Sequence, residues 1–328
     1  MDKSISLVVI GRNEGERLRI CLQSALGKVD RIVYVDSGSS DGSQEMAKSL
    51  GVEVVELDLS IPFTAARARN TGFEYLLKIN PTLVYVQFID GDCEIVDGWL
   101  ESAYQRLVSQ PEIALVCGRR RERFPRKSIY NRLCDMEWNT PIGEAKACGG
   151  DLMIRVTAFQ QVGGFNPTLI AGEEPELCVR LRQRGWKILR INAEMTLHDA
   201  QMTKFSQWWK RTLRSGHAYA EGAWLHGKPP ERHWIKESRS IKFWGFILPF
   251  LTVSLIGITS GWSLLLLVGY PLLTYRIYKG KQQQGLTSQD ASLYAIFCVL
   301  GKFVQIQGQI RFYMSRLLRK RSNLIEYK

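Results

Sequence analysis

Short apolar runs alternate with amphipathic segments over the first 90 residues, and this alternation constrains the fold more than any other feature of the chain. The segment between the first two runs carries Leu18, Cys21 and Leu22 on one stripe, which is typical of a surface helix. Strands that alternate with helices at this spacing predict βαβ units and an α/β fold with a mostly parallel central sheet. Buried strands are expected at residues 5–10, 31–35, 52–57 and 83–89.

Polar side chains follow three of these expected strands. Asn13 and Glu14 follow the first strand, the loop 36–43 follows the second, and Asp90 with Asp92 follows the fourth. Ligands of parallel α/β sheets bind in the crevice beyond the carboxyl ends of the strands. We therefore expect the three polar segments at one edge of the sheet, where they can form a single site.

The tripeptide Asp90-Gly91-Asp92 places two carboxylates at the end of a buried strand. Gly91 permits a tight bend, so both carboxylates can converge on one point. Hard oxygen ligands of this kind suit Mg²⁺ or Mn²⁺, which bridges to substrate phosphates. The same tripeptide is also a common turn between a strand and a helix, and this alternative stays open on the tripeptide alone.

The charge and the cysteine content limit the partners and the compartment. The 328 residues carry a net charge of +12, which suits nucleic acid, an anionic membrane surface or phosphorylated substrates. No nucleic-acid motif accompanies the basic stretches, so nucleic acid is not expected as a partner. The seven cysteines form no Cys-x-x-Cys pair, so we expect them to be reduced thiols. The N-terminus lacks the pattern of a signal peptide, so the first part of the chain is expected to fold in the cytoplasm.

A long uncharged stretch interrupted by Gly261 predicts a helical hairpin in the membrane. Lys242 precedes the stretch and Arg276 follows it, which favours both ends on the cytoplasmic side. A pair of core helices is the alternative. The expected domains are a catalytic domain at 1–225, a basic amphipathic linker at 226–242, a transmembrane hairpin at 243–278 and a membrane-associated helix at 290–321. A third span is the lesser alternative for that last helix.

Six segments occur in an order that resembles the family 2 glycosyltransferases, which are inverting enzymes with the GT-A fold. The resemblance covers roughly residues 4–198. The segments are Asn13-Glu14, Val35 to Ser43, Ala66 to Gly72, Asp90-Gly91-Asp92, Gly149 to Phe165, and Gly172-Glu173-Glu174 with the helix that follows. The resemblance implies a GT-A domain that binds a nucleotide sugar.

The resemblance also implies roles for individual residues. The implied nucleotide-binding residues are Asn13, Glu14, Asp36, Arg67, Arg69 and Asp90, and the implied metal ligands are Asp90, Asp92 and His198, for Mn²⁺ or Mg²⁺. His198 is expected in the loop after the last strand of the domain. Residues two apart on a helix do not share a face, so either Arg67 or Arg69 is expected to point to solvent.

For catalysis, the resemblance implies a general base at the start of the helix after Gly172. Glu174 takes the position of the base, although the family usually has Glu-Asp where this chain has Glu173-Glu174, so either carboxylate is a candidate. Arg12 is a second departure from the family pattern. Contacts with the donor or acceptor sugar are expected from Gly150, Asp151 and Trp208.

These expectations describe a membrane protein with its catalytic domain on the cytoplasmic side. It would move a sugar from a UDP- or GDP-type donor to a lipid-linked or glycan acceptor, in contact with membrane lipids. Two alternatives remain. A nucleotidyltransferase also binds nucleotides on an α/β sheet, and a non-catalytic subunit of a polysaccharide assembly complex could bind nucleotide sugars without turning them over.

Overall fold

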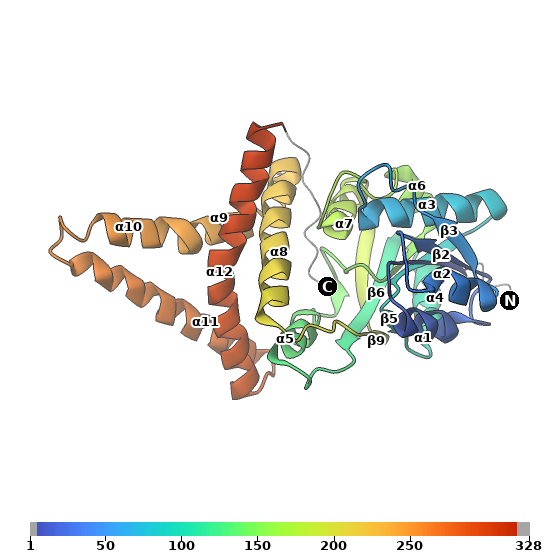
Figure 1. Ribbon diagram of the computed structural model, residues 1–328, viewed down its shortest axis with the longest axis horizontal. Coiled ribbons are helices and arrows are strands. Elements are labelled where there is room, and N and C mark those ends of the chain that lie inside the picture. The colour runs from blue at the N-terminus through green and yellow to red at the C-terminus, as the bar shows by residue number, and fades with distance from the viewer. Residues whose placement is uncertain (1–4, 320–328) are drawn as a thin grey trace. The chain divides into compact units, whose positions relative to one another are not determined.

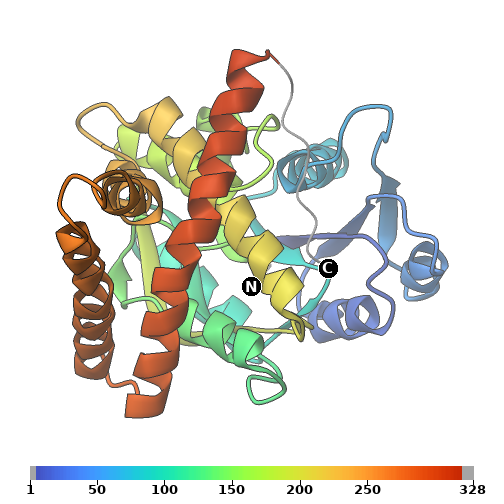
Figure 2. The same ribbon diagram turned by 60° about the vertical axis from the view of Figure 1, so that its left-hand side comes forward.

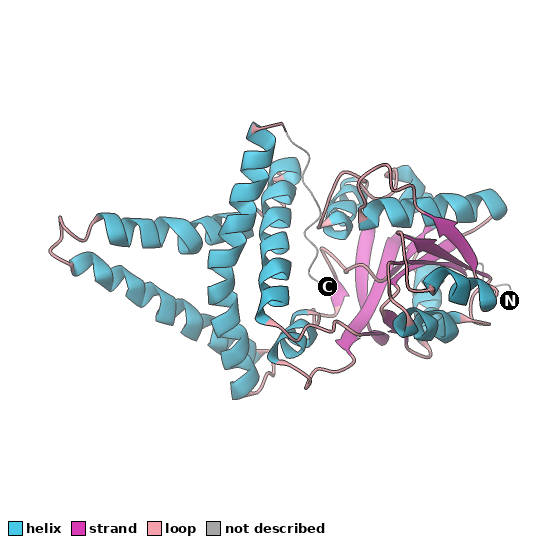
Figure 3. Cartoon of the chain, viewed as in Figure 1, coloured by secondary structure: helices cyan, strands magenta, loops and turns pink. Residues whose placement is uncertain are grey.

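The computed structural model describes residues 5–319, which form two compact units. The first unit combines residues 5–125 with 137–201 and is a mixed α/β structure, whereas the second combines 126–136 with 202–319 and is helical (Figure 3). The expected boundary of the catalytic domain near residue 225 stays a prediction.

The first unit is built on a nine-stranded sheet with the order β3-β2-β1-β4-β8-β6-β9-β5, and β7 also pairs with β9. The strands are β1 Ile5–Gly11, β2 Arg31–Asp36, β3 Glu53–Glu56, β4 Tyr85–Asp90, β5 Cys93–Ile95, β6 Ile113–Glu122, β7 Gly143–Glu144, β8 Leu152–Arg155 and β9 Lys187–His198. Strands β1 to β4 are parallel to one another, and β6 is parallel to β9. The α/β fold with a mostly parallel sheet is therefore confirmed, with β5, β7 and β8 as its antiparallel members.

Both faces of the sheet are covered by helices. These are α1 Glu16–Ala25, α2 Ser43–Ser49, α3 Ala65–Ile79, α4 Trp99–Ser109, α6 Val156–Gln161 and α7 Glu173–Gln183. Local chemistry sets where they begin: the Thr64 hydroxyl caps α3 by accepting the Arg67 N–H at 3.1 Å. The first turn of α7 carries three glutamates, which the helix dipole stabilises.

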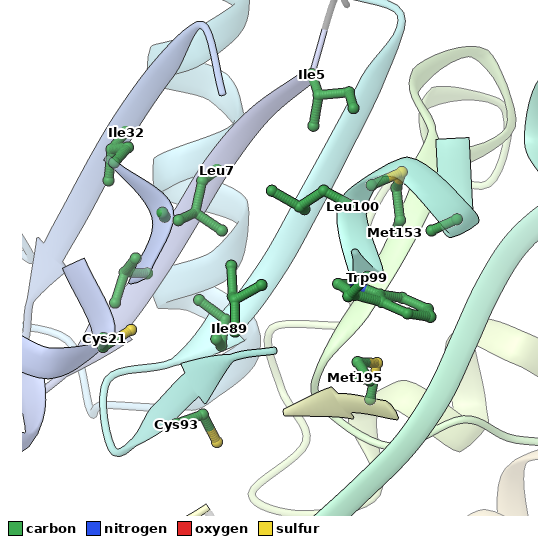
Figure 4. Packing of buried hydrophobic residues seen from close by; sticks show 14 of the residues in the cluster. Ile5, Leu7, Cys21, Ile32, Ile89, Cys93, Trp99, Leu100, Met153 and Met195 are labelled. Carbon is green, nitrogen blue, oxygen red and sulfur yellow. The ribbon is translucent and has the colours of Figure 1, made fainter. Parts of the chain in front are cut away.

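Alternate residues of β1 enter two separate hydrophobic clusters, one on each face of the sheet. Figure 4 shows the first cluster, in which Ile5 and Leu7 lie among side chains of α1, α4 and neighbouring strands. Trp99 is fully buried there, and its indole N–H donates to Gln87 Oε1 at 2.9 Å. Because both faces are buried, the strands read in the sequence as continuous apolar runs.

The ends of two long strands, β6 and β9, bring residues to the site. β9 continues to His198, so the expectation that His198 lies in a loop is wrong. β6 continues to Glu122, and irregularities in its pairing with β9 occur between Cys117 and Arg120.

The second unit consists of helices α5 Ile129–Glu137, α8 Phe205–His226, α9 Ile235–Lys242, α10 Leu248–Ser254, α11 Gly269–Gln283 and α12 Ser288–Leu317, with the short helices η1 Phe243–Ile247 and η2 Trp262–Val268. α8 and α12 lie side by side in both ribbon views (Figures 1 and 2). A Cβ at Gly216 would lie 2.1 Å from the Gln305 carbonyl oxygen, and one at Gly308 would lie 2.1 Å from that of Leu213. The two backbones therefore touch, and glycine is required at both positions.

A helical hairpin extends from this packed pair. α9, η1 and α10 form one arm, and η2 and α11 form the other (Figure 1). Gly261 lies in the connection between the arms, directly before η2, in the left-handed region with a φ of 89°. The arms expose large apolar side chains, among them Val253 at 68%, Ile258 at 82% and Trp262 at 72%. Among residues 5–319, α12 alone is long and apolar enough to cross a membrane.

Candidate active site

The loop after β2 is organised around the carboxylate of Asp36. This carboxylate accepts the N–H groups of Gly38 and Ser39 at 2.9 and 2.8 Å. The Tyr34 hydroxyl and the Gln44 amide donate to it at 2.7 and 2.9 Å. Burial acts to raise the pKa of Asp36, but the hydrogen bonds from Ser39, Tyr34 and Gln44 outweigh it and hold the pKa below its usual value. Asp36 is therefore an ionised anchor that fixes the shape of this loop.

Asn13 joins the loop after β1 to the loop after β2. It adopts a φ of 56°, its backbone N–H donates to Ser39 Oγ, and its side-chain oxygen accepts the Ser40 N–H at 2.8 Å. Glu14 forms an ion pair with Arg17 at 2.5 Å. The structure thus brings together the two polar loops that were expected at one edge of the sheet.

The two arginines of α3 have different partners. Arg67 is half-buried and donates to the backbone carbonyls of Asp58, Ile61 and Pro62 at 2.7 to 2.9 Å, so it holds the loop that precedes the helix. Arg69 is buried on the adjoining part of the helix surface and points into the site. This division agrees with the helical geometry, which does not let residues two apart share a face.

Asp90 is held between the buried Arg69 and the partly buried Arg120. Arg69 binds Asp90 Oδ1 at 2.7 Å, and Arg120 approaches Asp90 Oδ2 at 3.3 Å. Arg69 also binds Glu173 at 2.8 Å, so one guanidinium joins the end of β4 to the start of α7. A Cβ at Gly150 would lie 2.6 Å from Arg69 Nη2, which explains why glycine follows Gly149 there.

Asp151 is fully buried and anchors the other arginine. Arg120 binds Asp151 at 2.6 and 2.8 Å, and the Thr196 hydroxyl donates to the same carboxylate at 2.7 Å. Asp151 also accepts the backbone N–H of Asp90 at 3.2 Å. Asp151 therefore supports the position of Asp90 from within the core, and its expected contact with a sugar stays a prediction.

Asp92 and His198 form a separate group, in which His198 Nε2 lies 3.3 Å from Asp92 Oδ2. Together with Cys93 they offer three possible ligand atoms within 4.8 Å of one another. Burial raises the pKa of the Cys93 thiol, which leaves a carboxylate oxygen and an imidazole nitrogen as the stronger ligands. Carboxylate and imidazole together fit Mn²⁺ and, less specifically, Mg²⁺.

The two glutamates at the start of α7 face different surroundings. Glu173 binds Arg69, whereas Glu174 accepts the Cys148 N–H at 2.6 Å and the Cys178 thiol at 2.8 Å. Burial raises the pKa of Glu174, although hydrogen bonds from Cys178 and from the backbone of Cys148 and Gly149 oppose this rise. The surroundings of Glu174 thus make its carboxylate the more basic of the two, whereas the charge of Glu173 is balanced by Arg69.

Trp208 belongs to the second unit. It is buried there between Phe205 and Phe297, with ring centroids 5.3 and 5.0 Å away. Its expected contact with a sugar stays a prediction.

The sequence did not single out Arg120 or Glu122, which both line the site from β6. His198 lies beside both β5 and β6, because its Cα partners are Cys93 on β5 and Glu122 on β6. The sequence did contain one indication, because Arg120 and Glu122 are two residues apart, and residues at this spacing in a strand point to the same face.

Two features suited to binding a nucleotide sugar lie at this sheet edge. One is the loop after β2 that Asp36 anchors, and the other is the pair of a carboxylate and an imidazole that fits a divalent ion. The fold and the site define a glycosyltransferase of the GT-A class. Residues 6–157 match the family model described as glycosyl transferase family 2, and residues 133–205 match one described as the N-terminal domain of galactosyltransferase. These two matches support a family 2 glycosyltransferase.

Relatives and solved structures agree with this assignment. Glycosyltransferase AglE of Haloferax volcanii is 24% identical over 225 residues, which are 65% of this chain and 71% of that protein. The pre-mycofactocin glycosyltransferase of Mycobacterium tuberculosis is 26% identical over 238 residues, 68% of this chain and 48% of that protein. The mannosyltransferase PcManGT of Pyrobaculum calidifontis, solved with GDP-Man and Mn²⁺, has the same fold: its TM-score is 0.65 at 16% identity, covering 95% of this chain and 88% of that one. Both alternatives, a nucleotidyltransferase and a non-catalytic subunit, are therefore set aside.

Proposed function

We propose that the chain transfers a sugar from a nucleoside-diphosphate sugar to an acceptor hydroxyl, with inversion at the anomeric carbon. The observation that carries this proposal is the contrast at the start of α7. Glu174 has the raised pKa that suits a general base, while Glu173 is held by the same guanidinium that binds Asp90. A base on one side of the sugar and a leaving diphosphate on the other permit a single displacement, which inverts the configuration.

In this reaction Glu174 accepts the proton of the acceptor hydroxyl while the bond between the sugar and the diphosphate breaks. Arg69 is the buried cation nearest to Asp90, so it helps to balance the charge at the end of β4 as the donor binds. The loop of Asp36 and Asn13 would bind the base and ribose of a UDP- or GDP-type nucleotide. A GDP-sugar is the form bound in the Pyrobaculum mannosyltransferase.

Asp92 and His198 would hold the divalent ion, with Asp90 on the ribose side. The mixture of oxygen and nitrogen ligands favours Mn²⁺ over Mg²⁺, and Mn²⁺ is the ion in the Pyrobaculum structure. When bound, the ion would stabilise negative charge on the leaving diphosphate.

The second unit would attach the enzyme to the cytoplasmic face of a membrane through its hairpin. The exposed apolar side chains of η1, α10 and η2 have the character of a lipid-contacting surface. Lys242 and Lys281 lie near its base, where anionic lipid head groups would meet them. α12 is long and apolar enough to cross a membrane. It packs, however, against α8, which carries the charged residues Lys210, Arg211 and Arg214 and is therefore a poor neighbour for a membrane span. A lipid-linked sugar is the acceptor that such an attachment suits, with a soluble glycan as the alternative.

A donor screen with the full-length chain tests the proposed reaction. UDP- and GDP-sugars are offered with Mn²⁺, with Mg²⁺ or with a chelator, and release of the nucleotide is measured with and without lipid-linked acceptors. We expect one donor to be used with a divalent ion and faster turnover with the lipid-linked acceptor. Turnover that is unchanged by the chelator would contradict the metal dependence.

A further inference from the structure

We propose that Glu122 is a positioning residue that orients His198 for metal binding. This inference rests on the proposed metal dependence of the enzyme. Glu122 is the last residue of β6, and the register of β6 with β9 makes it the Cα partner of His198. Its side chain is fully buried, a position in which carboxylates are rare without a specific role.

The imidazole of His198 lies between two carboxylates, one near each ring nitrogen. Nδ1 lies 3.7 Å from Glu122 Oε2, and Nε2 lies 3.3 Å from Asp92 Oδ2. Trp138 packs against the ring edge-to-face with a centroid distance of 4.7 Å. The ring is therefore confined on three sides, and its two nitrogens have distinct surroundings.

The backbone around His198 fixes the carboxylate of Glu122. The Ala200 N–H donates to Glu122 Oε2 at 3.1 Å, and the Phe124 N–H donates to Oε1 at 3.1 Å. The Arg123 N–H donates to the His198 carbonyl oxygen at 2.8 Å, which ties the two strand ends together. The carboxylate is consequently held in a set position relative to the ring.

This arrangement suits one tautomer of His198 when a cation is bound. A neutral imidazole carries one N–H, and a cation held by Asp92 would require the lone pair of Nε2, the nitrogen that lies 3.3 Å from Asp92 Oδ2. The N–H is then on Nδ1, where it faces the Glu122 carboxylate. Histidine ligands commonly depend on such an outer carboxylate, and its loss typically weakens metal binding by about 10- to 100-fold.

A purely structural role is the competing explanation, since Glu122 also joins β6 to the backbone beyond His198. The two explanations differ in what a Glu122→Gln change does. The amide oxygen of glutamine can still accept one of the two backbone N–H groups, and the separate bond from the Arg123 N–H to the His198 carbonyl oxygen still joins the strand ends. The negative charge beside Nδ1 is lost, so the tautomer preference weakens.

The test measures the Mn²⁺ dissociation constant of the full-length chain from the electron paramagnetic resonance signal of free Mn²⁺. We expect E122Q to bind Mn²⁺ about 10- to 100-fold more weakly than the wild type, and E122D to recover part of the loss. The matched control is E112Q, an exposed glutamate just before the start of β6, which should bind like the wild type. The midpoint of thermal unfolding without metal is measured for each variant.

A double-variant cycle separates positioning from a general effect. If Glu122 acts through His198, then E122Q should weaken Mn²⁺ binding no further in a chain that already carries H198A. Wild-type affinity in E122Q, or a full further loss in the double variant, would overturn the inference while leaving the proposed function intact. Failure of the wild type to bind Mn²⁺ would overturn both, and the wild-type titration alone reveals it.

Discussion

Arg69 binds Asp90 Oδ1 at 2.7 Å from a buried position on α3. Because the same guanidinium binds Glu173 at 2.8 Å, this contact links the end of β4 to the start of α7. In the free enzyme Asp90 is thus charge-compensated before any donor arrives. The end of β4 and the proposed catalytic helix are held in one arrangement by a single side chain.

Replacing Arg69 with methionine should destabilise the first unit. Two partly buried carboxylates would lose their common cation, which costs about 3 kcal/mol of unfolding free energy. The matched control is Arg67→Met on the same helix, which removes only contacts to exposed loop carbonyls and should cost about 1 kcal/mol. Urea denaturation followed by tryptophan fluorescence measures both. Equal losses in the two variants would show that the Arg69 cluster has no special role.

Glu174→Gln should abolish turnover without preventing donor binding. A general base contributes about 10²- to 10⁴-fold to the rate, so the turnover number should fall by that factor. Glu173→Gln should instead weaken donor binding, because Arg69 would lose one of its two carboxylates. The measurement is the turnover number and the donor dissociation constant for each variant. A larger loss of turnover in Glu173→Gln than in Glu174→Gln would indicate that Glu173 is the general base.

The buried His217 and the partly buried Glu221 of α8 lie 3.5 Å apart and should give two opposing effects of pH on the second unit. Burial lowers the pKa of His217 to about 4 and raises that of Glu221 to about 7. The His217 contribution to stability is present above pH 6.5 and is lost as pH falls towards 4. The Glu221 contribution is present below pH 4.5 and is lost as pH rises through 7. Each amounts to about 3 kcal/mol, so the two largely cancel in the wild type.

Single variants should reveal these opposing slopes. Glu221→Gln leaves His217, so the midpoint of thermal unfolding should fall as pH is lowered from 6.5 to 4. His217→Gln leaves Glu221, so the midpoint should fall as pH is raised from 4.5 to 7. Parallel pH profiles for the two variants would contradict burial as the cause of the shifts.

Polar substitutions on the hairpin should release the chain from lipid. Changing Val253, Ile258 and Trp262 to serine removes three large apolar side chains, each worth about 1.5–3 kcal/mol when buried. Binding to vesicles that contain anionic phospholipid should weaken by more than tenfold in a sedimentation assay. Ile142→Ser, at an exposed apolar position of the first unit, serves as the control and should bind like the wild type.

Much of the sheet could be predicted from the sequence, because buried parallel strands leave continuous apolar runs. β1, β2 and β4 lie within one or two residues of the expected positions, and the polar loops after them meet at one edge. The separation of Arg67 from Arg69 also followed from helical geometry. These features depend on local periodicity, which the sequence contains.

The parts of the site that the sequence did not show depend on pairing between distant strands. Arg120 and Glu122 enter the site only because β6 runs on past an irregular stretch and stays paired with β9. Residues 119–122 are all charged, so the sequence has no apolar run there to indicate a strand. The different environments of Glu173 and Glu174 likewise arise from tertiary contacts with Arg69 and Cys178, which spacing along the chain does not encode.

The anomeric configuration of the first product tests the central claim most directly. The full-length chain is given an α-linked nucleoside-diphosphate sugar with Mn²⁺ and acceptor, and proton nuclear magnetic resonance follows the new glycosidic bond. Direct displacement assisted by Glu174 predicts a β-linked product. An α-linked product would contradict the inverting mechanism and the role proposed for Glu174.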